Sequence, residues 1–182
     1  MRLLNRIQMM NIEIKGKAKH MCKAEIKFAT AFFANYVMGE RLAKNLDFEI
    51  RFEDQGKMAE GHCHPLDGER RPRSFEIGIN PRLRRYKMLQ CLAHEMVHVK
   101  QYARGELSSE LITAKWQGKV YKITSSFEDY LNYPWEVEAY GRDRALYLFY
   151  QVLLKSEKVK FKHGHLYIKN KRLTIPKKNA NI

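Results

Sequence analysis

Two histidines and a glutamate in the segment His94-Glu95-Met96-Val97-His98 have the spacing of a hydrolytic metal-binding motif. Residues four apart on a helix share one face, so His94 and His98 can each offer a ring nitrogen to one tetrahedral metal ion. Glu95 would then lie beside the ion, where a carboxylate can hold and deprotonate a water molecule. This spacing predicts zinc-dependent hydrolysis with Glu95 as the catalytic base. The alternative is a pair of surface histidines on an ordinary amphipathic helix.

The residues around the motif predict one long helix from Asn80 to Gly105. Asn80 suits the N-cap, Pro81 suits the first helical position, and Gly105 is a natural C-terminal stop. Apolar residues recur at steps of three and four and form a stripe for the core, namely Leu89, Leu92, Ala93, Met96 and Val97. The two histidines lie away from this stripe, so another element must cover them.

A catalytic zinc site usually has three protein ligands and leaves the fourth position to water. The longer pattern HExxHxxGxxH is not met, because Gln101 and Arg104 occupy the glycine and final histidine positions, and the next histidine is His163. We therefore expect the third ligand to be a carboxylate on a later helix. That helix is predicted to begin at Pro134 and to end at about Ser156.

Glu136 and Glu138 are the two carboxylates near the start of this later helix. A helical wheel places Glu138 within an apolar face and Glu136 opposite it; that face consists of Val137, Gly141, Ala145, Leu148, Phe149 and Val152. The histidines also lie off the apolar stripe of their helix, so Glu136 is the favoured ligand and Glu138 the alternative. Ala139 is small enough for two helices to approach closely. Glu138 would then pair with Arg142 or orient a ligand histidine. Either glutamate could also be an ordinary acidic residue of a first helical turn.

The remaining patterns predict strands and one further helix. The helix runs from Met21 to about Asn45, and a half-buried strand covers 48–52. The other predicted elements are a short strand at Ile12 and Ile14, a hairpin joining 61–64 to 74–80, short strands or a loop at 116–123, and a terminal hairpin of 159–161 and 166–168 that Leu173 and Ile175 extend. The strand 74–80 leads directly into the histidine helix, so it should lie beside the metal.

The segment His62-Cys63-His64 also contains potential metal ligands. On a strand, however, alternate residues point to opposite faces, so Cys63 would be separated from the two histidines. A strand facing solvent or substrate is therefore favoured over a second metal site.

The composition is that of a folded chain. Its 182 residues are 45% hydrophobic, which predicts a single domain over 1–182, with a core at about 21–156 and a basic hairpin or tail at 157–182. The N-terminus shows no signal-peptide pattern, and the longest apolar run, 145–154, is too short to span a bilayer. The three cysteines form no disulfide framework. We therefore expect a cytoplasmic protein without a membrane partner.

The formal net charge of +14 and the pI near 9.7 are the other global features. Basic residues cluster at 15–23, 70–87 and 155–178. Such a surface suits contact with DNA or another polyanion, because basic side chains neutralise phosphates. The alternative is that the lysines solubilise the surface, and composition does not separate the two.

Three segments together resemble the SprT-like metallopeptidases of bacteria and phages. They are Ile77-Gly78-Ile79-Asn80-Pro81, the Leu-Ala-His-Glu-Met-Val-His stretch ending at His98, and Pro134-Trp135-Glu136-Val137-Glu138-Ala139, within residues 45–150. The resemblance implies an α+β, zincin-like fold, in which a small sheet packs on the motif helix and a second helix supplies a ligand. The spacing of Glu136 and Ala139 is also similar to that of glutamate-ligand zincins, in which the first glutamate binds zinc. SprT-type proteases usually carry a third histidine soon after the motif, and this chain has none.

The expected activity is hydrolysis of peptide bonds in a protein or peptide substrate. Zn²⁺ would be held by His94, His98 and Glu136, and the strand Ser74 to Asn80 could pair with an extended substrate. A donor to the oxyanion is expected from one of three residues, Tyr140, Tyr133 or His64. One rival interpretation is a basic nucleic-acid-binding or regulatory protein with a structural or vestigial zinc site. Another is a protease that acts on DNA-bound proteins.

Overall fold

The chain has a mixed α+β fold, as predicted. The computed structural model describes residues 10–54 and 60–173, and its largest sheet has four strands in the order β1-β2-β4-β3. Strands β1, β2 and β4 run parallel, and β3 pairs antiparallel with β4 at one edge. The bounds are Asn11–Lys15 for β1, Asp47–Phe52 for β2, Gly61–Pro65 for β3 and Ser74–Ile79 for β4.

The sheet has one apolar and one charged face because apolar and polar residues alternate along its strands. On the apolar face, the β2 residues Phe48 and Ile50 lie in register with Phe75 and Ile77 of β4, and all four are buried. The opposite face carries a line of ion pairs that crosses the strands, formed by Lys15, Glu49, Arg51 and Glu76. The predicted strands at 12–14 and 48–52 and the hairpin of 61–64 with 74–80 are therefore confirmed.

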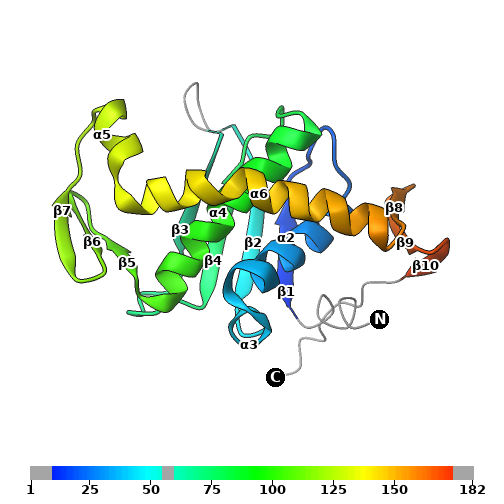
Figure 1. Ribbon diagram of the computed structural model, residues 1–182, viewed down its shortest axis with the longest axis horizontal. Coiled ribbons are helices and arrows are strands. Elements are labelled where there is room, and N and C mark those ends of the chain that lie inside the picture. Colours follow the sequence, from blue (N-terminus) through cyan, green and yellow to red (C-terminus); the bar gives the residue numbers. More distant parts are fainter. Residues whose placement is uncertain (1–9, 55–59, 174–182) are drawn as a thin grey trace.

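The helices that the structure describes all lie on the apolar side of this sheet (Figure 1). Helices α2 and α4 pack against it, and the long helix α6 crosses over both of them. The helix bounds are Lys23–Met38 for α2, Glu40–Ala43 for α3, Arg85–Arg104 for α4, Phe127–Asn132 for α5 and Pro134–Ser156 for α6. The single helix expected over 21–45 is thus two helices, because Gly39 adopts a φ of 83° and ends α2.

Helix α4 begins later than the sequence predicted. Asn80 and Pro81 belong to a turn, in which the side-chain oxygen of Asn80 accepts a hydrogen bond from the backbone N–H of Arg82, and Arg84 is the N-cap. The capping interaction of Asn80 is therefore real but serves the turn after β4 instead of the helix. The C-terminal prediction is confirmed, because Gly105 is the C-cap in a left-handed conformation.

The predicted apolar face of α6 is wrong. The residues of that face are exposed; for example, Val137 is 56% and Val152 is 63% exposed. The buried face instead consists of Trp135, Glu136, Ala139, Asp143, Leu146 and Tyr150. The wheel failed because the buried face carries two carboxylates, which a hydrophobicity pattern assigns to solvent.

Two small antiparallel sheets flank the ends of α6 (Figure 1). Their strands are β5 (Leu107–Ser109), β6 (Thr113–Trp116) and β7 (Lys119–Lys122) in one sheet, and β8 (Val159–Lys162), β9 (His165–Ile168) and β10 (Lys171–Leu173) in the other. Two-residue turns with positive φ join β6 to β7, β8 to β9 and β9 to β10, as at His163-Gly164 and Lys169-Asn170. The predicted terminal hairpin is confirmed and β10 extends it, whereas Ile175 lies outside the described residues.

One hydrophobic cluster joins the four-stranded sheet to α2, α4, α6 and the sheet β8–β10. A smaller cluster, centred on Tyr133 and Trp135, lies beneath β5–β7. Among the described helices, none combines the length and apolar character needed to cross a membrane.

Candidate metal centre

Helix α4 brings the two motif histidines together on its surface. The Nε2 atoms of His94 and His98 are 3.1 Å apart, as the four-residue spacing predicts. Both side chains are buried, because α6 and β3 cover this face of α4. The apolar stripe from Leu89 to Val97 packs against the sheet on the other side, so the core fixes the rotation of α4 about its axis.

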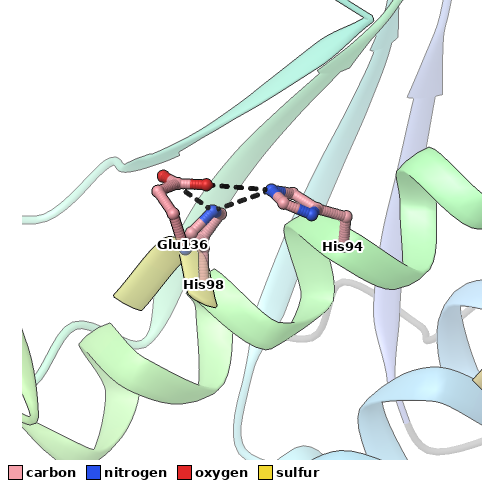
Figure 2. A group of neighbouring side chains, drawn as sticks. All are labelled: His94, His98 and Glu136. Carbon is pink, nitrogen blue, oxygen red and sulfur yellow. Dashed lines mark hydrogen bonds and ion pairs between the residues drawn. The ribbon is translucent and has the colours of Figure 1, made fainter. Parts of the chain in front are cut away.

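Glu136, in the first turn of α6, completes the group (Figure 2). Its Oε2 atom lies 3.3 Å from Nε2 of His94, and its Oε1 atom lies 3.4 Å from Nε2 of His98. Ala139, one turn further along α6, is fully buried and allows the two helices to pack closely. The structure therefore places Glu136, and not Glu138, beside the histidines.

The three donors have the chemistry and spacing to hold a metal ion. Ligand atoms about 2.0–2.1 Å from a tetrahedral zinc ion are separated from one another by about 3.3 Å. The observed separations of 3.1, 3.3 and 3.4 Å match this value. Within the described part of the chain, the buried Oε2 atom of Glu136 also lacks a hydrogen-bond donor, and a cation would satisfy it.

Charges in this group shift its protonation. Burial opposes the charge on Glu136, but the neighbouring imidazoles of His94 and His98 lower its pKa to about 2. Burial also opposes the charge on His94, yet the carboxylates of Asp143 and Glu136 beside it raise its pKa to about 9. The metal-free group therefore retains a proton on its imidazoles at neutral pH.

A hydrogen-bond chain orients His98. The side-chain oxygen of Gln101 is 2.8 Å from Nδ1 of His98, while the amide nitrogen of Gln101 donates to Glu138 and to the backbone oxygen of Trp135. Glu138 also accepts a hydrogen bond of 2.8 Å from Lys100 and lies 3.4 Å from Arg142. Both roles considered for Glu138, pairing with Arg142 and orienting a histidine, are thus met, the second of them through Gln101.

Asp143 faces Nδ1 of His94, as Gln101 faces Nδ1 of His98. Its Oδ2 atom lies 3.8 Å from Nδ1 of His94, and its Oδ1 atom accepts a hydrogen bond from Gln90. Asp143 is buried two turns after Glu136 on the same face of α6. The sequence analysis did not identify it, although its spacing from Glu136 was the available signal.

Glu95 lies at the centre of the site. It is buried, and it lines two cavities of about 560 and 190 Å³ that share the walls Gly61, Glu95 and Tyr130. Burial raises the pKa of Glu95, and the neighbouring His98 and His94 counteract that shift. A carboxylate with a raised pKa is a better proton acceptor than an exposed one.

The edge strand β3 passes very close to α4 at Gly61. A Cβ atom on Gly61 would lie 2.6 Å from Sγ of Cys91, 2.7 Å from the backbone oxygen of Gly78 and 3.2 Å from Oε1 of Glu95. A glycine is therefore needed at this position, and it brings the main chain of β3 directly beside Glu95.

Tyr130 and Tyr140 form an aromatic wall over the group. The Tyr130 hydroxyl interacts with the Glu136 carboxylate, and the Tyr140 ring lies 4.5 Å from the ring of His94. Burial and the negative charge of Glu136 raise the pKa of Tyr130, so its hydroxyl keeps its proton. Sequence reasoning missed Tyr130, because it belongs to a short helix with no buried residue and no motif of its own.

Two of the predicted oxyanion donors lie elsewhere. The Tyr133 hydroxyl donates to the backbone oxygen of Lys122 and accepts from the backbone N–H of Thr124. The rings of His64 and His62 lie tilted against each other, with centroids 4.7 Å apart, on the sheet face that the described helices leave open. The third candidate, Tyr140, is the one that the structure places at the site.

The prediction that Cys63 is separated from its neighbouring histidines is confirmed. Cys63 is buried against α4, and His62 packs over Gly78 on the opposite face. His62 instead approaches Glu76 and Glu53, but Glu76 also forms an ion pair of 2.6 Å with Arg51. This second cluster is thus part of the ionic surface of the sheet.

Comparisons with known proteins found no matching family, curated protein or solved structure.

Proposed function

We propose that this protein is a zinc-dependent metallopeptidase, in which His94, His98 and Glu136 hold the metal and Glu95 is the general base. One observation carries the proposal. Three buried donors from two helices converge at 3.1–3.4 Å, and a fourth buried group, the carboxylate of Glu95, lies beside them in the wall of an open cavity. A structural zinc site, by contrast, is normally closed by four protein ligands.

Zinc held by three protein ligands lowers the pKa of a water molecule and polarises a substrate carbonyl. The protein supplies the proton transfers. Glu95 accepts a proton from the attacking water and delivers it to the amine that leaves, which its raised pKa favours. The contacts of Gln101 and Asp143 hold the two imidazoles in the orientation that directs their Nε2 atoms inward.

The Tyr130 hydroxyl is the proposed donor to the oxyanion that forms at the substrate carbonyl. It retains its proton, lines both cavities and lies beside Glu136. Tyr140, on the wall of the larger cavity next to His94, is the second candidate. A preorganised donor of this kind stabilises the transition state more than the ground state.

An extended peptide fits the geometry beside the group. The expectation that Ser74 to Asn80 pairs with substrate is wrong, because β4 lies between β2 and β3 and both of its edges are occupied. In the described sheet the exposed edge nearest the group belongs to β3, which passes next to Glu95 at Gly61. Main-chain hydrogen bonds from β3 would hold a substrate as an added strand.

We propose in addition that the α+β fold is a zincin-like arrangement of the SprT-like or glutamate-ligand type. Its support is an edge strand beside the histidine helix and a second helix that carries the acidic donor. The proposed ligand set has two histidines and one glutamate, in place of three histidines.

Glu95→Gln is the decisive variant. We expect purified Glu95→Gln protein to bind one zinc per chain by atomic spectroscopy but not to cleave casein or an unstructured peptide mixture. His98→Ala should lose both zinc and activity, and the exposed Glu157→Gln should retain both. A chelator should abolish the cleavage by the unaltered chain. Full peptidase activity in Glu95→Gln would show that the assignment of the base is wrong.

A further inference from the structure

The sheet formed by β8, β9 and β10 is strongly basic. Residues 158–173 contain six lysines or arginines and two histidines but neither aspartate nor glutamate. Six positive charges without a negative one are therefore gathered on an ordered element at the end of α6 (Figure 1). Like charges on one element repel each other, and a bound polyanion would relieve this repulsion.

The strand alternation separates this sheet into two faces. Its inner face packs on the hydrophobic core through Val159, Phe161, Leu166, Ile168 and Leu173. Its outer face therefore presents the alternate residues, which are Lys160, Lys162, His165, Tyr167 and Arg172. We call these five residues the outer basic face.

Tyr167 lies at the centre of the outer basic face. It pairs directly with Lys160 on β8 and with Arg172 on β10, so a basic residue is its neighbour on each adjacent strand. Arg172 also contacts His165, with 2.9 Å between its Nη2 atom and Nε2 of the histidine. An aromatic ring flanked by cations on a sheet is the arrangement that stacks a base and neutralises the adjoining phosphates.

We propose that the outer basic face binds single-stranded nucleic acid, with Tyr167 stacking on a base and Lys160 and Arg172 contacting phosphates. An anionic membrane is a poorer partner, because the face has no protruding apolar side chain to insert into lipid. An acidic polypeptide would use the cations but not the ring. A duplex presents its phosphates but hides the faces of its bases.

The nucleic-acid surface and the candidate metal centre are at opposite ends of α6. Glu136 and Ser156 are twenty residues apart on this helix, which corresponds to about 30 Å. Substitutions on the outer basic face should therefore leave zinc content and peptidase activity unchanged. The two proposals can accordingly fail independently of each other.

The test is fluorescence anisotropy with the full chain and labelled thymidine 20-mers, compared with a 20-base-pair duplex at several salt concentrations. Tyr167→Ala should weaken single-strand binding about tenfold, and Tyr167→Phe should retain it, because a phenyl ring still stacks. The double variant Lys160→Glu with Arg172→Glu should abolish tight binding. It should also reduce the slope of log affinity against log salt concentration by about 1.4, because two phosphate contacts are lost. The matched control is Arg41→Glu with Lys44→Glu, two exposed residues at or next to α3, which should have little effect.

Three results would overturn the proposal. One is equal affinity for single strand and duplex with no effect of Tyr167→Ala. Another is equal or tighter binding to polyglutamate or to phosphatidylserine vesicles. The third is a loss in the control pair as large as that in Lys160→Glu with Arg172→Glu, which would indicate a general effect of net charge. Circular dichroism of each variant separates these results from unfolding.

Discussion

The side-chain oxygen of Gln101 lies 2.8 Å from Nδ1 of His98 and fixes the protonation of that imidazole. The amide nitrogen of Gln101 faces two acceptors, Trp135 O and Glu138 Oε2, so the oxygen must face the histidine. His98 therefore donates from Nδ1, and its Nε2 atom, which is directed toward His94 and Glu136, is the one that can bind a metal ion after losing its proton. Gln101 occupies the position of a glycine in the longer zinc motif, and here it orients His98.

Gln101→Leu should weaken zinc binding about 10–100-fold, because His98 then loses the acceptor that sets its tautomer. Competition with a chromophoric chelator measures the affinity. Gln151→Leu is the matched control, since Gln151 is a partly buried glutamine on α6 whose side-chain nitrogen has no hydrogen-bond partner in the described residues. Unchanged affinity in Gln101→Leu would show that Gln101 does not orient His98.

Glu136→Ala and Glu138→Ala should have different effects on the metal. Glu136 is 3.3 Å and 3.4 Å from the two imidazoles, so its removal should abolish stoichiometric zinc at micromolar concentrations. Glu138 contacts Gln101 and Lys100 instead, so its removal should lower the affinity but leave zinc bound. Metal analysis of the two purified variants makes the comparison. The opposite order would exchange their assigned roles.

The sequence predicted the donor group well because most of its geometry is local. The spacing of His94 and His98 within one helix dictates their convergence, and the length of α6 from Pro134 to Ser156 was also predicted. Glu136 was favoured for a partly incorrect reason, because the face assigned to the core of α6 is exposed. The prediction that Glu136, and not Glu138, lies beside the two histidines is nevertheless confirmed.

The contacts behind the donors could not be predicted, because they join residues distant in sequence. Asp143 reaches His94 only when α6 crosses α4, and Tyr130 reaches Glu136 only when α5 folds back over the start of α6. The same packing buries the carboxylates of Glu136 and Asp143, whereas a hydrophobicity pattern places charged residues of a helix in solvent. Asn80 was misassigned because a turn and a helix cap use the same side-chain interaction.

Tyr130→Phe should reduce kcat about 100-fold with little change in KM or zinc content, because the hydroxyl acts on charge that develops in the transition state. Steady-state kinetics with a fluorogenic peptide measures both parameters. Tyr36→Phe is the matched control, since Tyr36 is 52% exposed on α2. A Tyr130→Phe enzyme with normal kcat would exclude this role, and Tyr140→Phe would then be examined in the same assay.

Zinc binding at pH 7 should release protons. The pKa of His94 is raised to about 9 in the metal-free chain, so this imidazole is protonated at pH 7 and must lose its proton to bind zinc. Affinity should therefore increase from pH 6 to about pH 9 and level off above it, by about tenfold per pH unit for each proton released. Isothermal titration calorimetry in buffers of different ionisation enthalpy counts these protons.

Asp143→Asn is the informative variant for this measurement, because its carboxylate is a main cause of the raised pKa of His94. Fewer protons should be released at pH 7, and the affinity should level off at a lower pH than in the unaltered chain. A proton count of zero in the unaltered chain would contradict the proposed protonation of the group.

Two glycines should respond to alanine in opposite ways. At Gly61 a methyl group would meet Sγ of Cys91 at 2.6 Å and the backbone oxygen of Gly78 at 2.7 Å, so β3 must move away from α4. Gly61→Ala should lower the free energy of unfolding by about 1–3 kcal/mol. Gly141 lies on the exposed face of α6 with no atom within 4 Å of such a methyl group. Gly141→Ala should therefore raise that free energy by about 0.5–1 kcal/mol.

Urea unfolding measures both changes, and peptidase activity distinguishes their causes. Because Gly61 adjoins Glu95, Gly61→Ala should also lower activity in conditions where the variant is fully folded. Gly141→Ala should keep normal activity, since its side of α6 faces solvent. A destabilising Gly141→Ala would mean that this face of α6 is packed, as the sequence pattern alone had predicted. A neutral Gly61→Ala would mean that β3 does not approach α4 closely enough to place a substrate beside Glu95.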